Sequence, residues 1–250
     1  MQGDTLRCGS CAFGLTNQNG VLLQRSPAIA IRDTSDTMAL RLMHSSAVVR
    51  VYDSLWRPIL VHLASGIEAI DESRLLEDAI AGRPEARVLD LCCGTTVVGR
   101  TCVSAGGVEV VGIDASMEML RFARRSCSSE RLVLICADAT LTLPCASTFD
   151  VATCFAALHL LRDPYALLQA AANALRPGGV LLTWVLTARG VLGTTVARRI
   201  LSTLGVYMFE TDGLPPLLER AGFSVDRHWR HGAIELVAAR KLRASQEPRR

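Results

Sequence analysis

The feature that most constrains the fold is the alternation of short apolar runs with helical segments from Arg87 onward. The apolar runs read RVLDL, VEVVGID, LVLICAD, FDVATCF and GVLLTWVL. The segments between them include TVVGRTCVSAG, SMEMLRFARRSC and DPYALLQAAANAL. Nearly continuous apolar strands that alternate with helices indicate a parallel sheet covered on both faces. The final runs, FSVDRHWR and AIELVAARK, are joined by His231-Gly232, which favours an antiparallel pair at the end of the sheet.

The residues before this core divide into two regions of different texture. Residues 44–83 are expected to be helical, because Leu75, Leu76, Ala79 and Ile80 recur at helical spacing before the stop signals Gly82 and Pro84. Residues 1–43 are polar and carry short patterns only. We therefore expect an N-terminal appendage over residues 1–43 and one domain over residues 44–250. Within that domain, residues 44–83 form a helical lead-in and residues 84–241 form the sheet-containing core.

Composition excludes several classes of protein. The chain has 250 residues, is 50% apolar and carries only 20% charged residues, which argues against disorder. Its formal net charge of +3 is too small to indicate nucleic-acid binding. No apolar run approaches the roughly 18 residues of a membrane span, and the N-terminus lacks a secretory pattern. A cytoplasmic location is the expectation, with an organellar one as the alternative, and the nine cysteines are expected to be reduced thiols.

Three consecutive apolar runs end in an acidic residue, namely Asp90, Asp114 and Asp138. In open α/β sheets, ligands bind beyond the carboxyl ends of the strands. Asp114 follows Gly94 by 20 residues, the spacing at which an acidic side chain accepts hydrogen bonds from both hydroxyls of a ribose. Asp138 is suited to accept from an exocyclic adenine amine. Asp90 is suited to a ligand with a cationic centre, because it would repel a phosphate.

Five motifs together make the chain resemble class I S-adenosylmethionine-dependent methyltransferases of the small-molecule or quinone type, from about Tyr52 to Lys241. These motifs are VLDLCCGTT, VEVVGIDASMEML, LVLICADATLTLP, FDVATCFAALHLLRDP and LRPGGVLL. The resemblance implies a Rossmann-like α/β fold, with a seven-stranded sheet, helices on both faces and an antiparallel last strand pair. It also implies S-adenosylmethionine as the cofactor and a small organic molecule as the methyl acceptor.

The resemblance further implies where the cofactor binds. Asp90 and the turn from Cys92 to Thr95 would surround the methionine moiety, Asp114 would hold the ribose, and Asp138 with Ala139 would hold the adenine. Tyr52 would cover the cofactor, although plain packing is an equal alternative. The implied cofactor-binding residues are Asp90, Cys92, Gly94, Asp114, Ala115, Met119, Asp138, Ala139 and Phe155.

The first turn departs from the usual family pattern D-x-G-x-G-x-G. Cys92 and Thr96 replace the first and third glycines, and only Gly94 remains. Glycine is required where φ is positive or where the backbone touches a ligand. A cysteine fits the first position if its φ is negative, and Thr96 can begin the following helix as a cap. We expect cofactor binding to be retained, and the alternative is a degenerate pocket in a scaffold protein.

His159, in AALHLL after the fourth run, is the candidate catalytic residue. A general base is needed if the acceptor arrives protonated. The alternative is that His159 packs at the start of a helix. Residues 44–83 and Thr187–Gly213 are expected to select the acceptor, and the second segment contains an amphipathic stretch that can form a lid. A small, fairly apolar acceptor is the leading hypothesis, and RNA or protein methylation is the alternative.

The N-terminal region contains a C-x-x-C motif, Cys8 and Cys11. The region resembles a small zinc-ribbon-like domain found before some methyltransferases. A zinc site needs four ligands, usually in two pairs, and no second pair follows. The motif is therefore interpreted as degenerate, and no metal ligands are expected.

Overall fold

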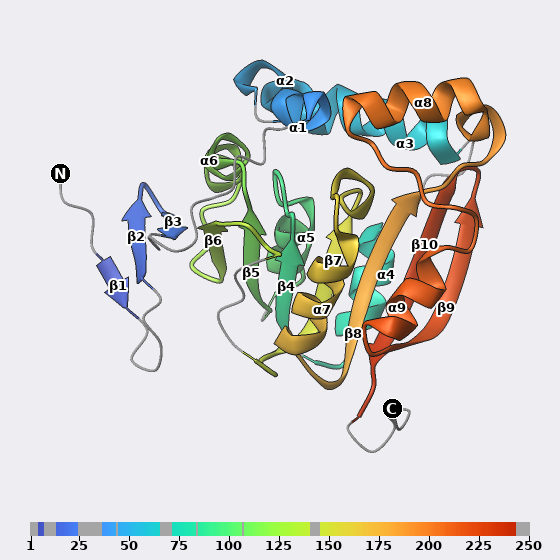
Figure 1. Ribbon diagram of the computed structural model, residues 1–250. Helices are drawn as coiled ribbons and strands as arrows, with labels where there is room; N and C mark the ends of the chain where they lie inside the picture. The colour runs from blue at the N-terminus through green and yellow to red at the C-terminus, as the bar shows by residue number, and fades with distance from the viewer. Residues whose placement is uncertain are drawn as a thin grey trace.

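A computed structural model describes residues 5–7, 14–24, 37–43, 45–65, 72–83, 85–106, 108–140 and 146–243. Its strands form one sheet in the order β1-β2-β3-β6-β5-β4-β7-β8-β10-β9 (Figure 1). The strand bounds are β1 Thr5–Arg7, β2 Gly14–Gln18, β3 Val21–Gln24, β4 Arg87–Leu91, β5 Glu109–Asp114, β6 Leu132–Cys136, β7 Phe149–Phe155, β8 Leu175–Leu186, β9 Phe223–His231 and β10 Ile234–Lys241.

The helices lie between and before these strands. The α-helices are α1 Met38–Met43, α2 Ser46–Val51, α3 Arg57–Ser65, α4 Glu72–Ile80, α5 Val97–Ala105, α6 Met117–Ser126, α7 Pro164–Ala174, α8 Thr195–Leu204 and α9 Leu214–Arg220. A π-helix, η2, covers Tyr52–Trp56, and two 3-10 helices, η3 and η4, cover Leu158–Leu160 and Gly190–Gly193. The expected helical lead-in is thus present over the described parts of residues 44–83.

The seven strands from β4 to β10 have the expected arrangement. Strands β6, β5, β4, β7 and β8 are parallel, and β10 lies antiparallel between β8 and β9. The connection between β9 and β10 contains Gly232 at a φ of 58°, a value that glycine adopts without steric cost. The α/β fold class and the antiparallel last pair predicted from the sequence are therefore confirmed.

The strand count is ten in the described residues rather than seven, because the N-terminal region joins the same sheet. Strand β3 pairs in parallel with β6, with Leu22 opposite Ile135 and Leu23 opposite Cys136. Strands β1 and β2 continue outward from it in antiparallel order. This addition covers the edge of β6, whose backbone groups would otherwise lack partners. Cys8 and Cys11 lie outside the described residues.

Two hydrophobic clusters place helices on opposite faces of the sheet. Leu89 and Leu91 of β4 belong to the cluster that contains buried side chains of α7 and α9. Val88, their neighbour on the same strand, belongs to the cluster that contains buried side chains of α4, α5 and α6. Successive side chains of a strand point to opposite faces, so a run without polar residues buries both.

A third set of helices lies across the carboxyl end of the parallel strands. In Figure 1, α3 and α8 lie above the ends of β8 and β10, and α1 and α2 lie above α6. Helix α8 belongs to the segment expected to form a lid, but none of its residues is fully buried, and Val196 and Ile200 are exposed. Within the described residues, every helix is too short or too polar to cross a bilayer.

Candidate functional site

A cavity of about 140 Å³ opens at the carboxyl edge of the parallel strands. Eight of the nine residues proposed from sequence to bind a cofactor line it, and Asp90 is the exception. The lining consists of Leu40, Tyr52, Cys92, Gly94, Asp114, Ala115, Ser116, Met119, Asp138, Ala139, Thr140, Phe155, Ala156, Ala157, Leu160 and Leu161. Residues far apart in the sequence thus meet because parallel strands end at one edge.

Asp114 is held rigidly at the end of β5. Its Oδ2 accepts a hydrogen bond of 2.8 Å from the backbone N–H of Gly94, and its Oδ1 accepts one of 2.8 Å from the backbone N–H of Ser116. Ser116 is also the N-cap of α6, since its hydroxyl accepts from the Met119 N–H at 3.3 Å. Each carboxylate oxygen has two lone pairs, so the same two oxygens can also accept from hydroxyl groups of a ligand.

Asp138 follows β6 and is oriented by its own turn. Its Oδ1 accepts hydrogen bonds from the backbone N–H of Thr140 at 2.9 Å and from the Thr140 hydroxyl at 2.7 Å. Its other oxygen accepts no hydrogen bond from the described residues. This oxygen can therefore accept a hydrogen bond from an amino group in the cavity.

Asp90 lies in β4 beneath the turn and is 3% exposed. Its Oδ1 accepts a hydrogen bond of 2.7 Å from the hydroxyl of Thr153, whereas its Oδ2 is buried and has no partner among the described residues. Burial raises the pKa of Asp90 to about 7, although the Thr153 hydrogen bond acts in the opposite direction. A buried carboxyl without a counter-ion remains partly protonated at neutral pH, and a nearby cation would favour its ionised form.

The glycine-poor turn adopts the backbone conformation that glycine favours. Cys92, Gly94 and Thr96 have φ values of 55°, 53° and 52°, all in the left-handed region. Cys92 therefore does not meet the condition of a negative φ. Thr96 is the N-cap residue of α5, as expected, although its side chain makes no cap hydrogen bond. The turn thus has the left-handed conformation at all three positions. At Cys92 and Thr96, which are not glycine, this conformation costs roughly 1–2 kcal/mol each.

Two residues of the lead-in reach this turn. Asp53 in η2 accepts a hydrogen bond from the Thr95 hydroxyl and forms an ion pair of 2.6 Å with Arg100 of α5. Its neighbour Tyr52 lines the cavity, as the resemblance implied, and burial raises the pKa of this phenol to about 12. Sequence reasoning missed Asp53, Thr95 and Arg100 as a group, because no local spacing relates residue 53 to residues 95 and 100.

His159 lies in η3, outside the cavity lining. It is 5% exposed, its ring centroid is 6.0 Å from that of Trp184, and its Nδ1 accepts a hydrogen bond of 3.4 Å from the Leu186 N–H. Burial lowers its pKa to about 4, so the imidazole is neutral at neutral pH. An Nδ1 that accepts leaves the proton on Nε2. In this conformation His159 therefore packs the edge of the sheet, and its role as a base stays a prediction.

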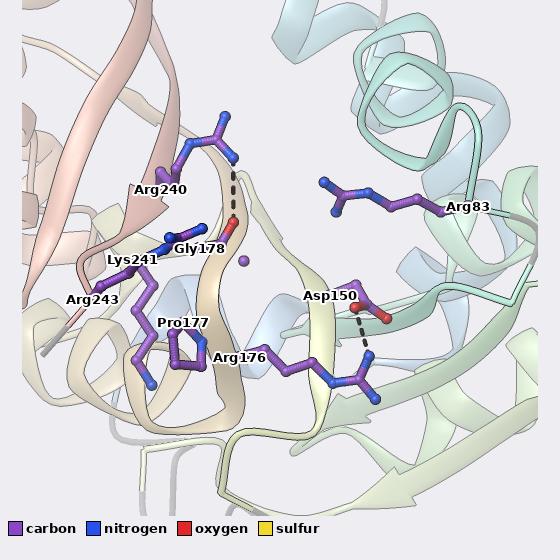
Figure 2. A pocket seen from close by; sticks show the side chains of 9 residues that line it. Arg83, Asp150, Arg176, Pro177, Gly178, Arg240, Lys241 and Arg243 are labelled. Carbon is purple, nitrogen blue, oxygen red and sulfur yellow. Dashed lines mark hydrogen bonds and ion pairs between the residues drawn. The ribbon is translucent and has the colours of Figure 1, made fainter.

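A second cavity, of about 510 Å³, lies at the opposite edge of the sheet and is lined by cations (Figure 2). Arg83, Arg176, Arg240, Lys241 and Arg243 surround it with one acidic residue, Asp150. Asp150 pairs with Arg176 at 2.8 Å, and Arg240 donates to the Gly178 carbonyl at 3.2 Å. This edge carries the amino ends of the parallel strands. Ligands of open α/β sheets bind at the other edge, so the candidate cofactor site is the smaller cavity.

Comparison with known proteins agrees with this fold. Residues 88–179 match the family model described as a methyltransferase domain. The solved structure of phosphoethanolamine N-methyltransferase 2 from Haemonchus contortus, bound to S-adenosyl-L-methionine, superposes with a TM-score of 0.66 at 16% identity, covering 86% of this chain and 60% of that one. Residues 88–179 therefore match a methyltransferase domain, and the core around them has the same Rossmann-like fold as that solved structure.

A relative in sequence and a second solved structure bear on the reaction. The ubiquinone biosynthesis O-methyltransferase of Xanthomonas campestris pv. campestris strain B100 is 31% identical over 149 residues, which cover 54% of this chain and 60% of that protein. The chain thus matches little more than half of that relative. The solved [4+2]-cyclase SpnF has the same fold, with a TM-score of 0.57, 20% identity and coverage of 79% and 96% of the two chains. The shared fold therefore does not fix the reaction.

Proposed function

We propose that this chain binds S-adenosylmethionine in the cavity at the carboxyl edge and transfers its methyl group to a small, apolar organic acceptor. The observation that carries the proposal is the meeting of eight residues, chosen from sequence motifs alone, around one cavity. S-adenosylmethionine supplies a methyl group made electrophilic by its sulfonium. The protein mainly has to hold a nucleophile in line with that group and exclude water.

The polar groups of the cavity fit the parts of this cofactor. The carboxylate of Asp114 would accept from the two ribose hydroxyls, and the second oxygen of Asp138 would accept from the adenine amine. Gly94 forms the floor: a side chain there would meet no protein atom within 4 Å and would occupy the space proposed for the ligand. The buried Oδ2 of Asp90, without a partner among the described residues, fits the positive charge of the methionine end.

Binding requires movement of the segment that covers the cavity. The cavity has a volume of about 140 Å³, which is smaller than the roughly 300–1,000 Å³ typical of small-molecule sites. Leu40 of α1 and Tyr52 of η2 contribute to its lining and come from the helices that cross the edge. We infer that these helices move outward when the cofactor binds. A π-helix such as η2 is a frequent feature of functional sites.

Exposed apolar side chains around this edge support an apolar acceptor. Six large hydrophobic residues on the covering helices are exposed to solvent, namely Met38, Val51, Leu55, Ile59, Val196 and Ile200. These side chains lie on the elements that cover the cavity, so an apolar acceptor that approaches from this side would contact them. The Xanthomonas relative is a ubiquinone biosynthesis O-methyltransferase, and the O-methylation in its name supports an acceptor that carries a hydroxyl group.

Replacing Asp114 with alanine should weaken binding of S-adenosylhomocysteine by roughly 10- to 100-fold, because two ribose hydrogen bonds worth about 1–3 kcal/mol in total are lost. Isothermal titration calorimetry on the full chain measures the effect. Asp226→Ala is the matched control, since Asp226 lies on β9 and does not line the cavity. Equal affinity of Asp114→Ala and the unchanged protein would refute the ribose assignment.

The same titration distinguishes an enzyme from a scaffold. Absence of heat with both S-adenosylmethionine and S-adenosylhomocysteine would contradict the proposed function as a whole. If binding is observed, incubation with cofactor labelled in its methyl group and a metabolite extract identifies the acceptor. We expect the label in an organic-soluble small molecule, and label in RNA or protein would favour the alternative class.

A further inference from the structure

Three side chains with metal-binding chemistry meet away from the cofactor cavity. Asp212 lies in the turn before α9, His228 in β9 and Glu235 in β10, and their ligand atoms all lie within 4.8 Å of one another. The His228 Nε2 is 2.9 Å from the Glu235 Oε1 and 3.9 Å from the Asp212 Oδ1. Arg230 faces Glu235 across the strand pair and His228 faces Val237, so these side chains share one face of the sheet.

Glu235 is the unusual member of this cluster. It is 1% exposed, and neither of its carboxylate oxygens forms a hydrogen bond of acceptable geometry with the described residues. The buried Nε2 of His228 is likewise without a hydrogen bond there, although it lies close to Glu235. The Oε1 of Glu235 is paired with His228 at 2.9 Å, whereas its buried Oε2 has no hydrogen-bond partner among the described residues, so the carboxylate can accept a further cation.

Neighbouring charges do not fully compensate the cluster. Among the described residues, Arg230 contributes a guanidinium to the cluster, and it pairs with Asp212. Two carboxylates and one guanidinium leave a net negative charge beside the imidazole. Asp212 also has a φ of 63°, in the left-handed region, where a non-glycine residue persists only if its surroundings hold it.

We propose that Asp212, His228 and Glu235 bind one divalent transition-metal ion of the zinc type. One imidazole nitrogen and two carboxylate oxygens form a donor set that zinc accepts, whereas calcium and magnesium prefer oxygen ligands only. Donors at zinc-ligand distances of about 2.0–2.2 Å in a tetrahedron lie about 3.3–3.6 Å apart. The separations of 2.9 and 3.9 Å bracket this range. Asp212 is 53% exposed on its side chain, so water can take the fourth position.

The ion would link the 210–213 turn to the β9–β10 hairpin. This turn ends the segment whose helix α8 crosses the carboxyl edge of the sheet (Figure 1). Just before it, the Phe209 N–H donates to the Leu186 carbonyl at 2.9 Å, which brings the segment back to the end of β8. The site is therefore structural, and it is independent of the proposed methyl transfer. Sequence analysis missed it, because its members are spread over 24 positions and follow no metal-binding spacing.

Zinc titration of the chelator-treated full chain tests this site. Cys8→Ser and Cys11→Ser serve as the background, because two thiolates at C-x-x-C spacing would add zinc ligands unrelated to the proposed site. We expect one zinc equivalent by calorimetry and a higher melting temperature with zinc, as expected for a ligand that binds the folded state. His228→Gln and Glu235→Gln should abolish both effects. His62→Gln, at an exposed position of α3, is the matched control and should retain them.

Asp212→Asn keeps the test decisive even if the buried variants fail to fold. Position 212 is exposed, and asparagine tolerates a positive φ, so this variant should fold normally. We expect it to bind zinc at least ~10-fold more weakly, because a charged ligand of the ion is lost. Cobalt should bind the background protein without the intense charge-transfer absorption of thiolate ligands. Absence of zinc binding in the background protein, or equal affinity in Asp212→Asn, would overturn the proposal and leave an imidazolium–carboxylate ion pair.

Discussion

Replacing Gly99 with alanine should lower the free energy of unfolding by about 2–3 kcal/mol, although alanine is the better helix former. Gly99 lies in the first turn of α5, where an added Cβ would stand only 2.3 Å from the Thr96 Oγ1 and 3.0 Å from the Leu132 Cδ1. Thr96 is fully buried, so its side chain cannot move aside into solvent. Urea-induced unfolding followed by circular dichroism measures the loss.

The loss of stability caused by Gly99→Ala should depend on Thr96, the residue that replaces the third glycine of the family pattern. Thr96→Gly removes a left-handed β-branched residue and a buried hydroxyl without a partner among the described residues, so it should be neutral or stabilising. With the hydroxyl gone, the methyl group added by Gly99→Ala loses its closest contact, and the Leu132 contact remains. We therefore expect a coupling energy of about 2 kcal/mol between the two substitutions in a double-mutant cycle. Additive effects would contradict the packing described for this turn.

Asp90 should lower the stability of the ligand-free protein as the pH rises from about 4 to about 8, whereas buried His159, with its lowered pKa, acts in the opposite direction below about pH 6.5, and Asp90→Asn should remove the Asp90 contribution. The folded protein keeps a proton on Asp90 up to about pH 7, whereas the unfolded chain loses it near the ordinary pKa of 3.8. The unfolded state then binds fewer protons, so stability falls with rising pH. Burial causes the shift, and about 1.36 kcal/mol per pKa unit gives about 4 kcal/mol over this interval.

Urea unfolding at several pH values, with the unchanged protein and Asp90→Asn in parallel, measures this difference. Asparagine keeps an oxygen for the Thr153 hydroxyl and removes only the ionisation. Other groups titrate equally in both proteins, so the difference between the two curves reports Asp90. Parallel curves would show that Asp90 ionises normally in the folded state. The same variant should bind S-adenosylmethionine more weakly, because the proposed partner of its positive charge is neutral.

The part of the candidate site that lies on the strands could be predicted because its residues stand at fixed places in a local pattern. Asp114 and Asp138 end apolar runs, and the parallel sheet brings the ends of those runs together. The lead-in could be predicted only as helical. Its contacts through Asp53 to Thr95 and Arg100 join segments more than 40 residues apart, and no periodicity encodes such a meeting.

By itself, the sequence determined the class of fold, the antiparallel last strand pair and the cavity residues from Cys92 to Phe155. These follow from the alternation of strands and helices, which is set by burial along each short segment. Only the tertiary structure decided the positive φ of Cys92, the pairing of β3 with β6 and the burial of Glu235 beside His228. The physical reason is that each of these depends on which distant surfaces pack together, and packing between distant segments leaves no period in the chain.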